Sequence, residues 1–439
     1  MEPLEYRDFE IEIGVSDGTH YPVAVLHSPS GQARTVTQLP FDRETFDQQL
    51  AALEDAILDD THDDPAQVVE DFGSQLFDAL IREQVRSVYD RSRQATADQG
   101  QGLRIKLRIN APELATIPWE YLYDPRQGEF VALSRYAPIV RYLELPLPDP
   151  EMAVEGPLRI LGMVSSPSDV ESLDVEREKA RLEDAVREMQ ESGLVELVWL
   201  EGQTWRDLQA AMQGGPWHIF HFIGHAVFDD DSGEGYLHLA DDDGYSSPLS
   251  ATQLGRLLAD HHTLRLTLLN ACEGARGHEQ SVFSSTASVL VQRGLPAVLA
   301  MQYEISDQAA IEFTSSFYGA LIANLPVDAA VSEARKAISL AEPESMEWGT
   351  PALFMRAPDG VIWTVKKEEA AIGGRNLMLP ILAAPVLVLI VIGILVYPMV
   401  KPLWNPAQMT GQFRIAVAEF GELDSDGNVR QSESGQVLS

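Results

Sequence analysis

Two residues of this chain have the types that nucleophilic catalysis by a thiol requires. Cys272 is the only cysteine among the 439 residues, and it comes just after the apolar run Leu264–Leu269. His225 follows a second apolar run, Trp217–Ile223, in the same way. An imidazole can take the proton of a thiol, and the resulting thiolate can attack a carbonyl carbon. The pair is therefore a candidate catalytic dyad.

The two apolar runs indicate how these side chains would meet. Each run has the length of a buried strand, and parallel strands present the residues after their carboxyl ends at one edge of a sheet. Consecutive strands often lie side by side, about 5 Å apart. If these two are neighbours, the thiol and the imidazole share one cleft. Gly224 allows a close backbone approach, so its N–H and that of Cys272 are candidates for an oxyanion hole.

Other interpretations of these residues stay open. A lone cysteine at a strand end is more often a small buried hydrophobic residue than a nucleophile. A single cysteine excludes an intramolecular disulfide. His218, His221 and His225 with Cys272 could suggest zinc, but on a strand the three rings do not converge on one face. No G-x-x-x-x-G-K-[ST] phosphate loop occurs either, so we expect no metal and no other cofactor.

The elements that would carry the pair belong to an α/β pattern. From residue 151 to residue 366, apolar strands alternate with amphipathic helices, which predicts a mostly parallel sheet with helices on both faces. The expected strands are Leu158–Val164, Val195–Leu200, Trp217–Ile223, Leu264–Leu269 and Pro296–Met301, followed by Pro351–Arg356 and Val361–Val365. The expected helices are Leu173–Gln190, Ser250–Asp260 and Ser281–Gln292, with others beginning at Thr204, Ser306 and Val327.

The pattern of residues 1–150 predicts a separate α+β region. This region would be either a regulatory part or a pseudo-peptidase half. The proline-punctuated connection Pro146–Pro157 marks its end. Its expected elements are strands at Phe9–Val15 and Tyr21–Leu26, two amphipathic helices around Phe46–Ile57 and Phe72–Val88, and strands at Leu103–Ile109 and Ser134–Leu145.

A membrane span is expected after the soluble part. Leu377–Val400 contains no charged residue and is longer than the roughly 20 residues that cross a bilayer as a helix. The alternative is a buried core helix. Residues 367–376 would be a juxtamembrane linker, and its basic residues outnumber those after the span, which keeps the N-terminal portion cytoplasmic. Residues 401–439 form a short tail, interpreted as the start of a truncated domain that includes Phe413–Phe420.

The charge balance excludes one class of partner. The chain has 67 acidic and 32 basic residues, for a formal net charge of −35. Nucleic acids need a cationic surface, so none is expected as a partner. Asp229–Asp231 follow His225 closely, and we interpret them as a solvated turn, with a tuning effect on the imidazole as the alternative.

Several motifs together resemble a known family. They lie in order between Leu158 and Gly360 and read HFIGHA, LTLLNACEGAR, GLPAVLAMQYEISDQAAIEF, FYGAL, LPVDAAVSEARKAI and WGTPALFMRAPDG. These motifs are similar to those of the CHAT family of caspase-like cysteine peptidases, relatives of separase and, more distantly, of caspases and gingipains. The stretch LRIKLRINAPELATIPWEYLYDP resembles the region that often precedes this domain.

The resemblance implies roles for the candidate residues. His225 becomes the catalytic base and Cys272 the nucleophile, while Glu273 stands where many members have threonine. The ISD segment looks similar to the part of separase whose acid holds a basic P1 side chain. Asp307, or else Glu304, would then select arginine or lysine. The alternative is that Asp307 helps to cap a helix beginning at Ser306.

The combined interpretation is a caspase-like fold and a membrane-tethered cysteine endopeptidase. It would cut a protein substrate after activation by a sensor or partner protein, in bacterial defence or regulated signalling, as the resemblance implies. Two alternatives remain: a non-catalytic membrane-anchored scaffold, and an effector whose span disturbs the bilayer. Replacing Cys272 by alanine separates them, because a scaffold keeps its activity.

Overall fold

The chain forms two units by its internal contacts, Met1–Glu368 and Glu369–Ser439. The computed structural model describes residues 4–38, 43–58, 64–146, 152–170, 172–229, 231–271, 279–303, 305–366, 422–423 and 429–430. In the second unit the described residues are two short strands, β19 (Glu422–Leu423) and β20 (Val429–Arg430), which pair antiparallel.

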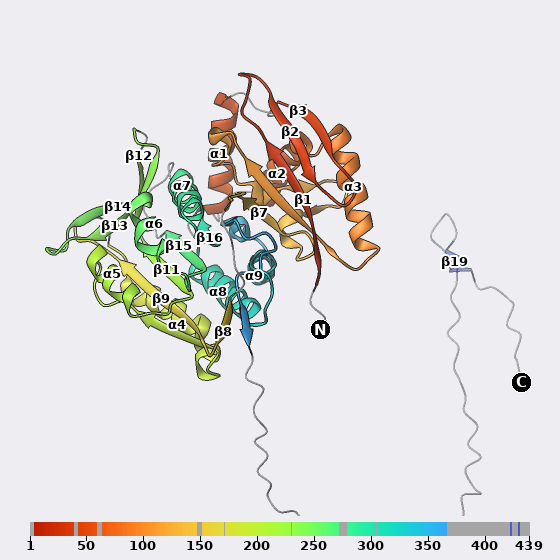
Figure 1. The fold of residues 1–439 in the computed structure, drawn as a ribbon. Coiled ribbons are helices and arrows are strands. Elements are labelled where there is room, and N and C mark those ends of the chain that lie inside the picture. Colours follow the sequence, from red (N-terminus) through yellow and green to blue (C-terminus); the bar gives the residue numbers. More distant parts are fainter. Residues whose placement is uncertain are drawn as a thin grey trace, which may run out of the picture. The chain divides into compact units, whose positions relative to one another are not determined.

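The first unit is built on an eleven-stranded sheet (Figure 1). In spatial order its strands are β10 (Val195–Trp199), β9 (Leu158–Ser165), β11 (Ile219–Gly224), β15 (Leu266–Ala271), β16 (Ala297–Met301), β17 (Pro351–Met355), β7 (Ile139–Tyr142), β4 (Gly102–Ile109), β1 (Tyr6–Ile13), β2 (Tyr21–His27) and β3 (Ala33–Thr37). Adjacent strands are parallel except for β16–β17, β1–β2 and β2–β3. The predicted mostly parallel sheet is confirmed.

Helices cover both faces of the sheet around β11, as the apolar strand runs predict. On one face lie α4 (Val175–Glu191), α8 (Asp307–Ile322) and α9 (Val327–Ala341), and on the other lie α5 (Trp205–Gln213), α6 (Ala251–Ala259) and α7 (Glu279–Gln292). Alternate β11 side chains point to opposite faces. Ile219 packs in the core with Leu182 of α4, whereas Phe220 packs in the core with Leu254 of α6 and Leu290 of α7.

Side-chain caps begin the helices at the expected residues. Ser250 and Gln253 form the predicted reciprocal capping box of α6, and Thr204 forms one with Asp207 at the start of α5. The Ser306 side chain accepts a hydrogen bond from the backbone N–H of Ala309 and caps α8. These caps place the helix starts at the same sheet edge as the strand ends that precede them.

The N-terminal part has three helices where two were predicted. They are α1 (Arg43–Leu58), α2 (Pro65–Leu80) and α3 (Glu83–Ala97). Phe72, Leu76 and Leu80 lie buried on α2, but Val88 belongs to α3. Arg82 between them has an extended backbone, with φ −126° and ψ 162°, so one helical period does not continue through it. Strand β3 was not predicted, and β7 is shorter than the predicted strand over 134–145.

The sheet continues across the boundary predicted near residue 150. Strand β7 pairs in parallel with β17, with Arg141 opposite Phe354. Strand β8 (Ala153–Glu155) likewise pairs with β18 (Thr364–Lys366). The predicted division stays a prediction, but strands from before and after it form one sheet.

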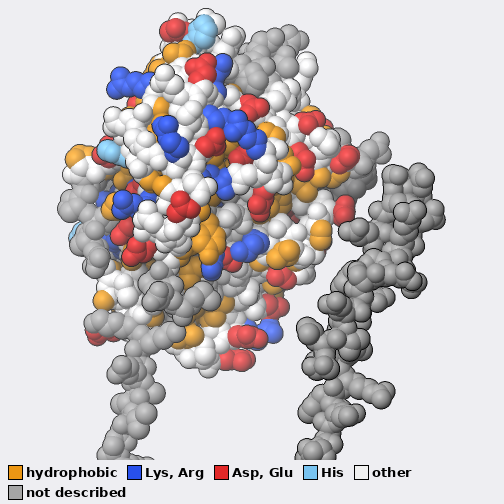
Figure 2. Space-filling view, turned by 90° about the vertical axis from the view of Figure 1, so that its right-hand side faces the viewer, with side chains coloured by type: hydrophobic (Ala, Val, Ile, Leu, Met, Phe, Trp, Pro, Cys, Tyr) orange, Lys and Arg blue, Asp and Glu red, His pale blue; other side chains and the backbone are white. Residues whose placement is uncertain are grey.

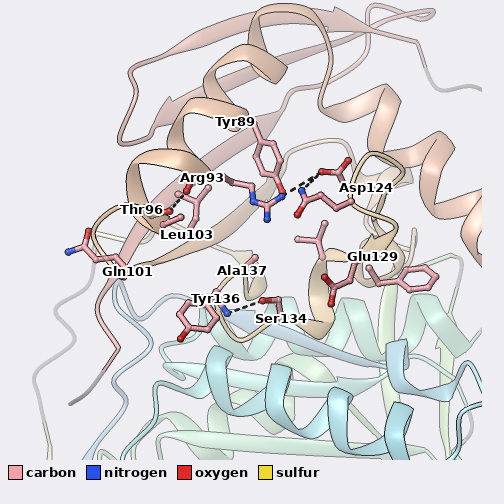
Figure 3. A pocket seen from close by; sticks show the side chains of 15 residues that line it. Tyr89, Arg93, Thr96, Gln101, Leu103, Asp124, Glu129, Ser134, Tyr136 and Ala137 are labelled. Atoms are coloured by element: carbon pink, nitrogen blue, oxygen red, sulfur yellow. Dashed lines mark hydrogen bonds and ion pairs between the residues drawn. The ribbon is translucent and has the colours of Figure 1, made fainter. Parts of the chain in front are cut away.

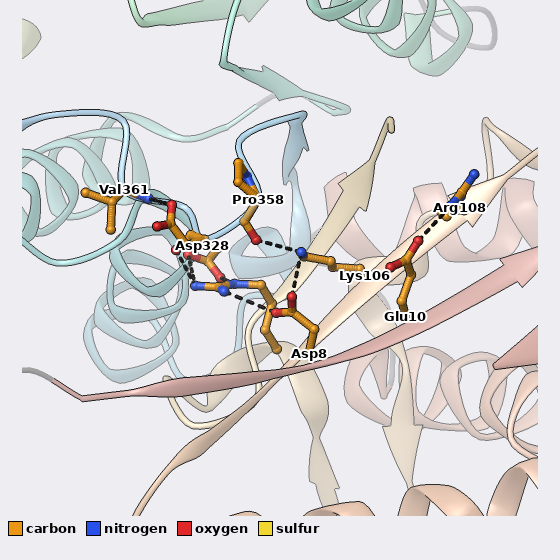
Figure 4. Close-up of polar contacts among 9 residues, drawn as sticks. Asp8, Glu10, Lys106, Arg108, Asp328, Pro358 and Val361 are labelled. Atoms are coloured by element: carbon orange, nitrogen blue, oxygen red, sulfur yellow. Dashed lines mark hydrogen bonds and ion pairs between the residues drawn. The ribbon is translucent and has the colours of Figure 1, made fainter. Parts of the chain in front are cut away.

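A charged network joins the N-terminal strands to the end of the same unit (Figure 4). Arg104 on β4 donates to the Asp328 carboxylate of α9, with 2.5 Å between Nε and Oδ2. Lys106 Nζ donates to Asp8 at 2.7 Å and to the Pro358 carbonyl at 2.6 Å. Arg104, Lys106 and Asp328 are all buried. The Arg104–Asp328 pair holds β4 against α9, and Lys106 joins β4 to Asp8 of β1 and to the Pro358 carbonyl.

The predicted membrane helix, Leu377–Val400, and the strand-like segment Phe413–Phe420 lie outside the described residues. Among the residues that are described, no helix is both long enough and apolar enough to cross a bilayer.

Candidate functional site

The strands that carry the candidate dyad are direct neighbours. Strand β11 pairs in parallel with β15, and Gly224 lies opposite Ala271. His225 and Cys272 are the residues that follow this matched pair in the sequence. The expectation that the two strands are adjacent is therefore confirmed. Cys272 itself lies outside the described residues, together with residues 273–278, so its contact with His225 stays a prediction.

Gly224 is in a position that admits no side chain. A Cβ atom there would lie 2.6 Å from the Phe222 ring and 3.0 Å from the Ser165 carbonyl oxygen on β9. Glycine at this position lets β11 and β9 approach this closely next to His225. This close packing agrees with the reason for singling out Gly224, whereas the oxyanion hole that includes Cys272 remains a prediction.

A small sheet that the sequence analysis missed begins directly after His225. It consists of β12 (Ala226–Asp229), β13 (Glu234–Ala240) and β14 (Ser246–Ser250), all antiparallel. The alternation in EGYLHLA could have revealed β13. Between β12 and β13 the chain turns, with the Gly233 N–H donating to the Asp229 carbonyl at 2.7 Å. Asp231 thus lies in this turn, as interpreted, whereas Asp229 is the last residue of β12 and Asp230 lies outside the described residues.

His238 of β13 is the second histidine at this edge. Its backbone N–H donates to the His225 carbonyl oxygen at 2.9 Å, and its ring Nδ1 lies 2.6 Å from the Ser246 hydroxyl. Burial and, to a smaller degree, the neighbouring His225 lower the pKa of His238, while Asp169 acts in the opposite direction. His238 therefore favours its neutral form beside the candidate base. Only the pairing of β12 with β13 reveals this neighbour.

Two further histidines, His221 of β11 and His218 just before it, make their contacts inside the fold. His221 Nδ1 lies 3.0 Å from the Tyr318 hydroxyl of α8, and burial lowers its pKa to about 4. His218 Nδ1 accepts the Arg159 backbone N–H at 2.9 Å, and burial with the Arg159 charge lowers its pKa to about 4. The described residues contain no group of three potential metal ligands.

The candidate specificity acid, Asp307, is engaged by two arginines of its own chain. Arg177 Nε donates to its carboxylate at 2.6 Å, and Arg181 forms a second ion pair with it. Both arginines lie on α4, while Asp307 begins α8 and Ser306 provides the cap. The Asp307 side chain is 42% exposed. Glu304, the alternative acid, lies outside the described residues.

A hollow of about 370 Å³ lies in the N-terminal part, between α3, the start of β4 and the loop before β7 (Figure 3). The strands β5 (Tyr123–Asp124) and β6 (Glu129–Phe130) complete its wall. Burial raises the pKa of the Tyr89 hydroxyl at its floor to about 12. None of the predicted site residues lines this hollow.

The molecular surface over the N-terminal strands is mixed in charge. Figure 2 shows basic and acidic side chains lying side by side on this face. In the N-terminal part, Arg126 forms an exposed ion pair with Asp90 at 3.0 Å.

Comparison with solved structures finds distant similarity to cysteine peptidases. The Saccharomyces cerevisiae separase–securin complex matches with 10% identity and a TM-score of 0.42, covering 80% of this chain and 30% of that one. The Arg-specific cysteine proteinase gingipain R matches with 13% identity and a TM-score of 0.37, covering 70% of each chain. A complex of the pro- and mature domains of Porphyromonas gingivalis RgpB matches with 12% identity and a TM-score of 0.35, over 70% of this chain and 72% of that one. At these scores the likeness by itself identifies no activity.

The sequence comparisons are more specific. No curated protein sequence is significantly similar to this chain. A family model does match, however, and it is described as the CHAT domain and covers residues 70–359. That range includes β11, β15 and both members of the candidate dyad, and it also begins within α2 of the N-terminal part. Because the match covers more than half of the chain, the protein belongs to the CHAT domain family.

Proposed function

We propose that this chain is a caspase-like cysteine endopeptidase with Cys272 as its nucleophile and His225 as its general base. The observation that supports the proposal is the pairing of β11 with β15, in which Gly224 lies opposite Ala271. In the sequence, each of these two residues is followed by a member of the proposed dyad. Open α/β sheets place reactive groups at this edge. The sequence supplies a single thiol for this role.

The chemistry needs only these two side chains and the peptide backbone. The His225 imidazole takes the thiol proton, and the Cys272 thiolate attacks the scissile carbonyl carbon. The N–H groups of Gly224 and Cys272 are the proposed donors to the oxyanion that develops. The tetrahedral intermediate collapses to an acyl-enzyme as the imidazolium protonates the leaving amine. Water, activated by the neutral imidazole, then hydrolyses the thioester and restores the thiol.

The proposed selectivity for a basic P1 residue depends on Asp307 or Glu304. In the structure Arg177 and Arg181 already neutralise Asp307, so a substrate arginine or lysine would compete with them for the same carboxylate. The ion pairs also show that Asp307 joins α8 to α4. We therefore propose that a basic P1 side chain competes with Arg177 and Arg181 for Asp307, and that it does not enter an empty acidic pocket.

The proposed setting is the cytoplasmic face of a membrane. Leu377–Val400 would anchor the chain, and the anchor would restrict cleavage to protein substrates near the bilayer. A sensor or partner protein would activate the enzyme in bacterial defence or regulated signalling. Deleting residues 377–400 tests the anchor: the shortened chain is expected in the soluble fraction, and continued membrane association would contradict it.

The peptidase proposal is tested by comparing new protein N-termini in cells that express the native chain, Cys272→Ala or His225→Ala. We expect a set of cleavages with the native chain that both substitutions abolish. His262→Ala, which changes an exposed histidine, is the matched control and is expected to keep them. Identical N-termini with all chains would contradict the proposal, and a cellular function retained by Cys272→Ala would favour a scaffold.

A further inference from the structure

The strand that begins directly after His225 lies at the edge of the small sheet. Strand β12 pairs with β13, and β14 lies on the far side of β13. An edge strand presents one row of unpaired backbone groups, on which an extended chain can add as a further strand. Because β12 starts at the candidate base, a chain added there would pass next to the reacting centre.

The hydrogen-bond register shows which peptide groups form this free row. The His238 N–H donates to the His225 carbonyl, so this opposed pair is hydrogen-bonded. Hydrogen-bonded and non-hydrogen-bonded pairs alternate along an antiparallel ladder. Ala226, opposite Leu237, and Phe228, opposite Gly235, therefore point their N–H and C=O groups away from β13. Among the described residues, no turn or loop backbone hydrogen bond reaches these two positions.

The side chains of β12 alternate in the way that a docking strand needs. Ala226 and Phe228 are partly buried and pack against the core that contains Leu290 of α7. Val227 is 43% exposed and Asp229 is also exposed, on the opposite face. The inner face is thus held by packing, while the outer face is exposed and no described strand pairs with the edge.

The acidic end of β12 indicates the charge of that partner. Strands rise about 3.3 Å per residue, so Asp229 lies about 13 Å along the strand from His225. Asp231 is exposed in the turn that follows. A peptide paired with β12 would place the side chain about four residues from its scissile bond near these carboxylates. A lysine or arginine at that position would be favoured over an acidic residue.

We propose that the free edge of β12 binds the substrate backbone as an added strand, on one side of the scissile bond, and that Asp229 and Asp231 favour a basic residue about four positions away. The inference rests on the proposed peptidase function and deepens it by naming a substrate class, an extended segment with a distal basic residue. It assigns the contact to backbone groups of Phe228 and Ala226, independently of the P1 residue.

Phe228→Pro is the substitution that tests the backbone contact. Proline removes the outward N–H of residue 228 but none of the β12–β13 ladder bonds, because that N–H does not face β13. Phe228→Leu is the matched control, since it keeps the N–H and loses a similar amount of ring packing. Circular dichroism and thermal melts of both variants establish that they fold.

The assay uses two libraries of quenched fluorescent peptides, extended only on the amino side or only on the carboxyl side of the scissile bond. We expect Phe228→Pro to lower kcat/KM about tenfold relative to Phe228→Leu in one library and not in the other. That loss would correspond to about 1.4 kcal/mol. An equal effect in both libraries, or no effect in either, would overturn strand addition while leaving the peptidase function intact.

The charge preference has its own readout in the same assay. Asp231→Asn is expected to reduce several-fold the advantage of lysine over glutamine at the fourth position, without changing cleavage of peptides that lack that position. An unchanged advantage would overturn the assignment of the acidic turn. Absence of cleavage of every peptide by the native chain would instead contradict the proposed peptidase function, and the inference would fall with it.

Discussion

His221 and His225 lie four residues apart but have different environments. His221 points into the core toward Tyr318, whereas His225 follows the strand end and is only partly buried. Alternate residues of a strand point to opposite faces, and His221 lies within β11 on a face that packs in the core. His225 comes after Gly224, the last residue of β11. One histidine is therefore part of the core, and the other is the proposed base.

The buried His221 predicts acid sensitivity of the fold. Burial lowers its pKa from 6.5 to about 4, so the unfolded chain binds the proton more tightly. Its contribution is complete above pH 6.5 and is lost as the pH falls toward 4. The loss amounts to at most about 3 kcal/mol. Urea unfolding at pH 7 and pH 5 should show a smaller pH dependence for His221→Gln than for the native chain.

His262→Gln serves as the control for this measurement because His262 is exposed. Its pH dependence is expected to equal that of the native chain. If His221→Gln also retained the full pH dependence, the buried neutral ring would not be the cause.

The sequence singles out the two residues of the candidate dyad, but it does not reveal the surroundings of His225. Cys272 and His225 each follow an apolar run, and this pattern is local. His238 becomes a neighbour of His225 only through the pairing of β12 and β13. The two arginines that pair with Asp307 come from an earlier helix. Arg177, for example, lies 130 residues before Asp307 in the chain. Long-range contacts of this kind have no local signal.

At the scale of elements, the start of α8 is tied to α4 through Asp307. Arg181 is mostly buried, with its side chain 17% exposed, while Arg177 is half exposed. Exposed ion pairs contribute little to stability, up to about 1 kcal/mol. Their larger effect is to occupy the carboxylate that is proposed to bind a basic P1 residue.

Removing the two arginines should therefore change selectivity more than stability. In the double variant Arg177→Gln, Arg181→Gln, we expect kcat/KM for peptides with arginine at P1 to rise by about fivefold, a gain of about 1 kcal/mol. Peptides with alanine at P1 are expected to be unaffected. Asp307→Ala should remove the preference for arginine. An unchanged P1 profile in both variants would leave Asp307 with a purely structural role between α4 and α8.

The elements themselves were largely predictable where they are long and periodic. The strands β9, β11, β15 and β16 lie within about two residues of their predicted bounds, because each is a buried apolar run. Short elements were missed, among them the five-residue β3 and the four-residue β12. The break at Arg82 was also missed, because α2 and α3 continue the apolar spacing across it.

In the first unit as a whole, the N-terminal part and the part that carries the candidate dyad share one sheet. The proline-punctuated connection suggested two domains, but strand pairing does not follow chain order: β7 comes before the connection and pairs with β17, which comes near the end of the unit. Composition marks a connection in the chain but carries no information on which strands pair across it. The start of the family match at residue 70 agrees with a joint unit.

The buried Arg104–Asp328 pair provides a test of that joint unit. Asp328→Asn should lower the free energy of unfolding by about 3 kcal/mol, because the buried Arg104 guanidinium then loses its buried anionic partner and keeps only the partly exposed Asp8. Glu344→Gln, an exposed carboxylate on the same part of the chain, should change it by less than about 0.5 kcal/mol. Denaturant unfolding measures both. Equal stability of the two variants would mean that this contact does not hold β4 against α9.

The most direct test of the central claim is the rate at which iodoacetamide alkylates Cys272 as a function of pH. The chain has a single cysteine, so the total alkylation rate reports that thiol alone. An unperturbed thiol ionises near pH 8.5, whereas a thiol paired with an imidazole forms its thiolate at lower pH. We expect rapid alkylation of the native chain at pH 6.5 and a rate at least tenfold lower in His225→Ala. Equal rates in the two chains, both rising with a pKa near 8.5, would contradict a Cys272–His225 dyad.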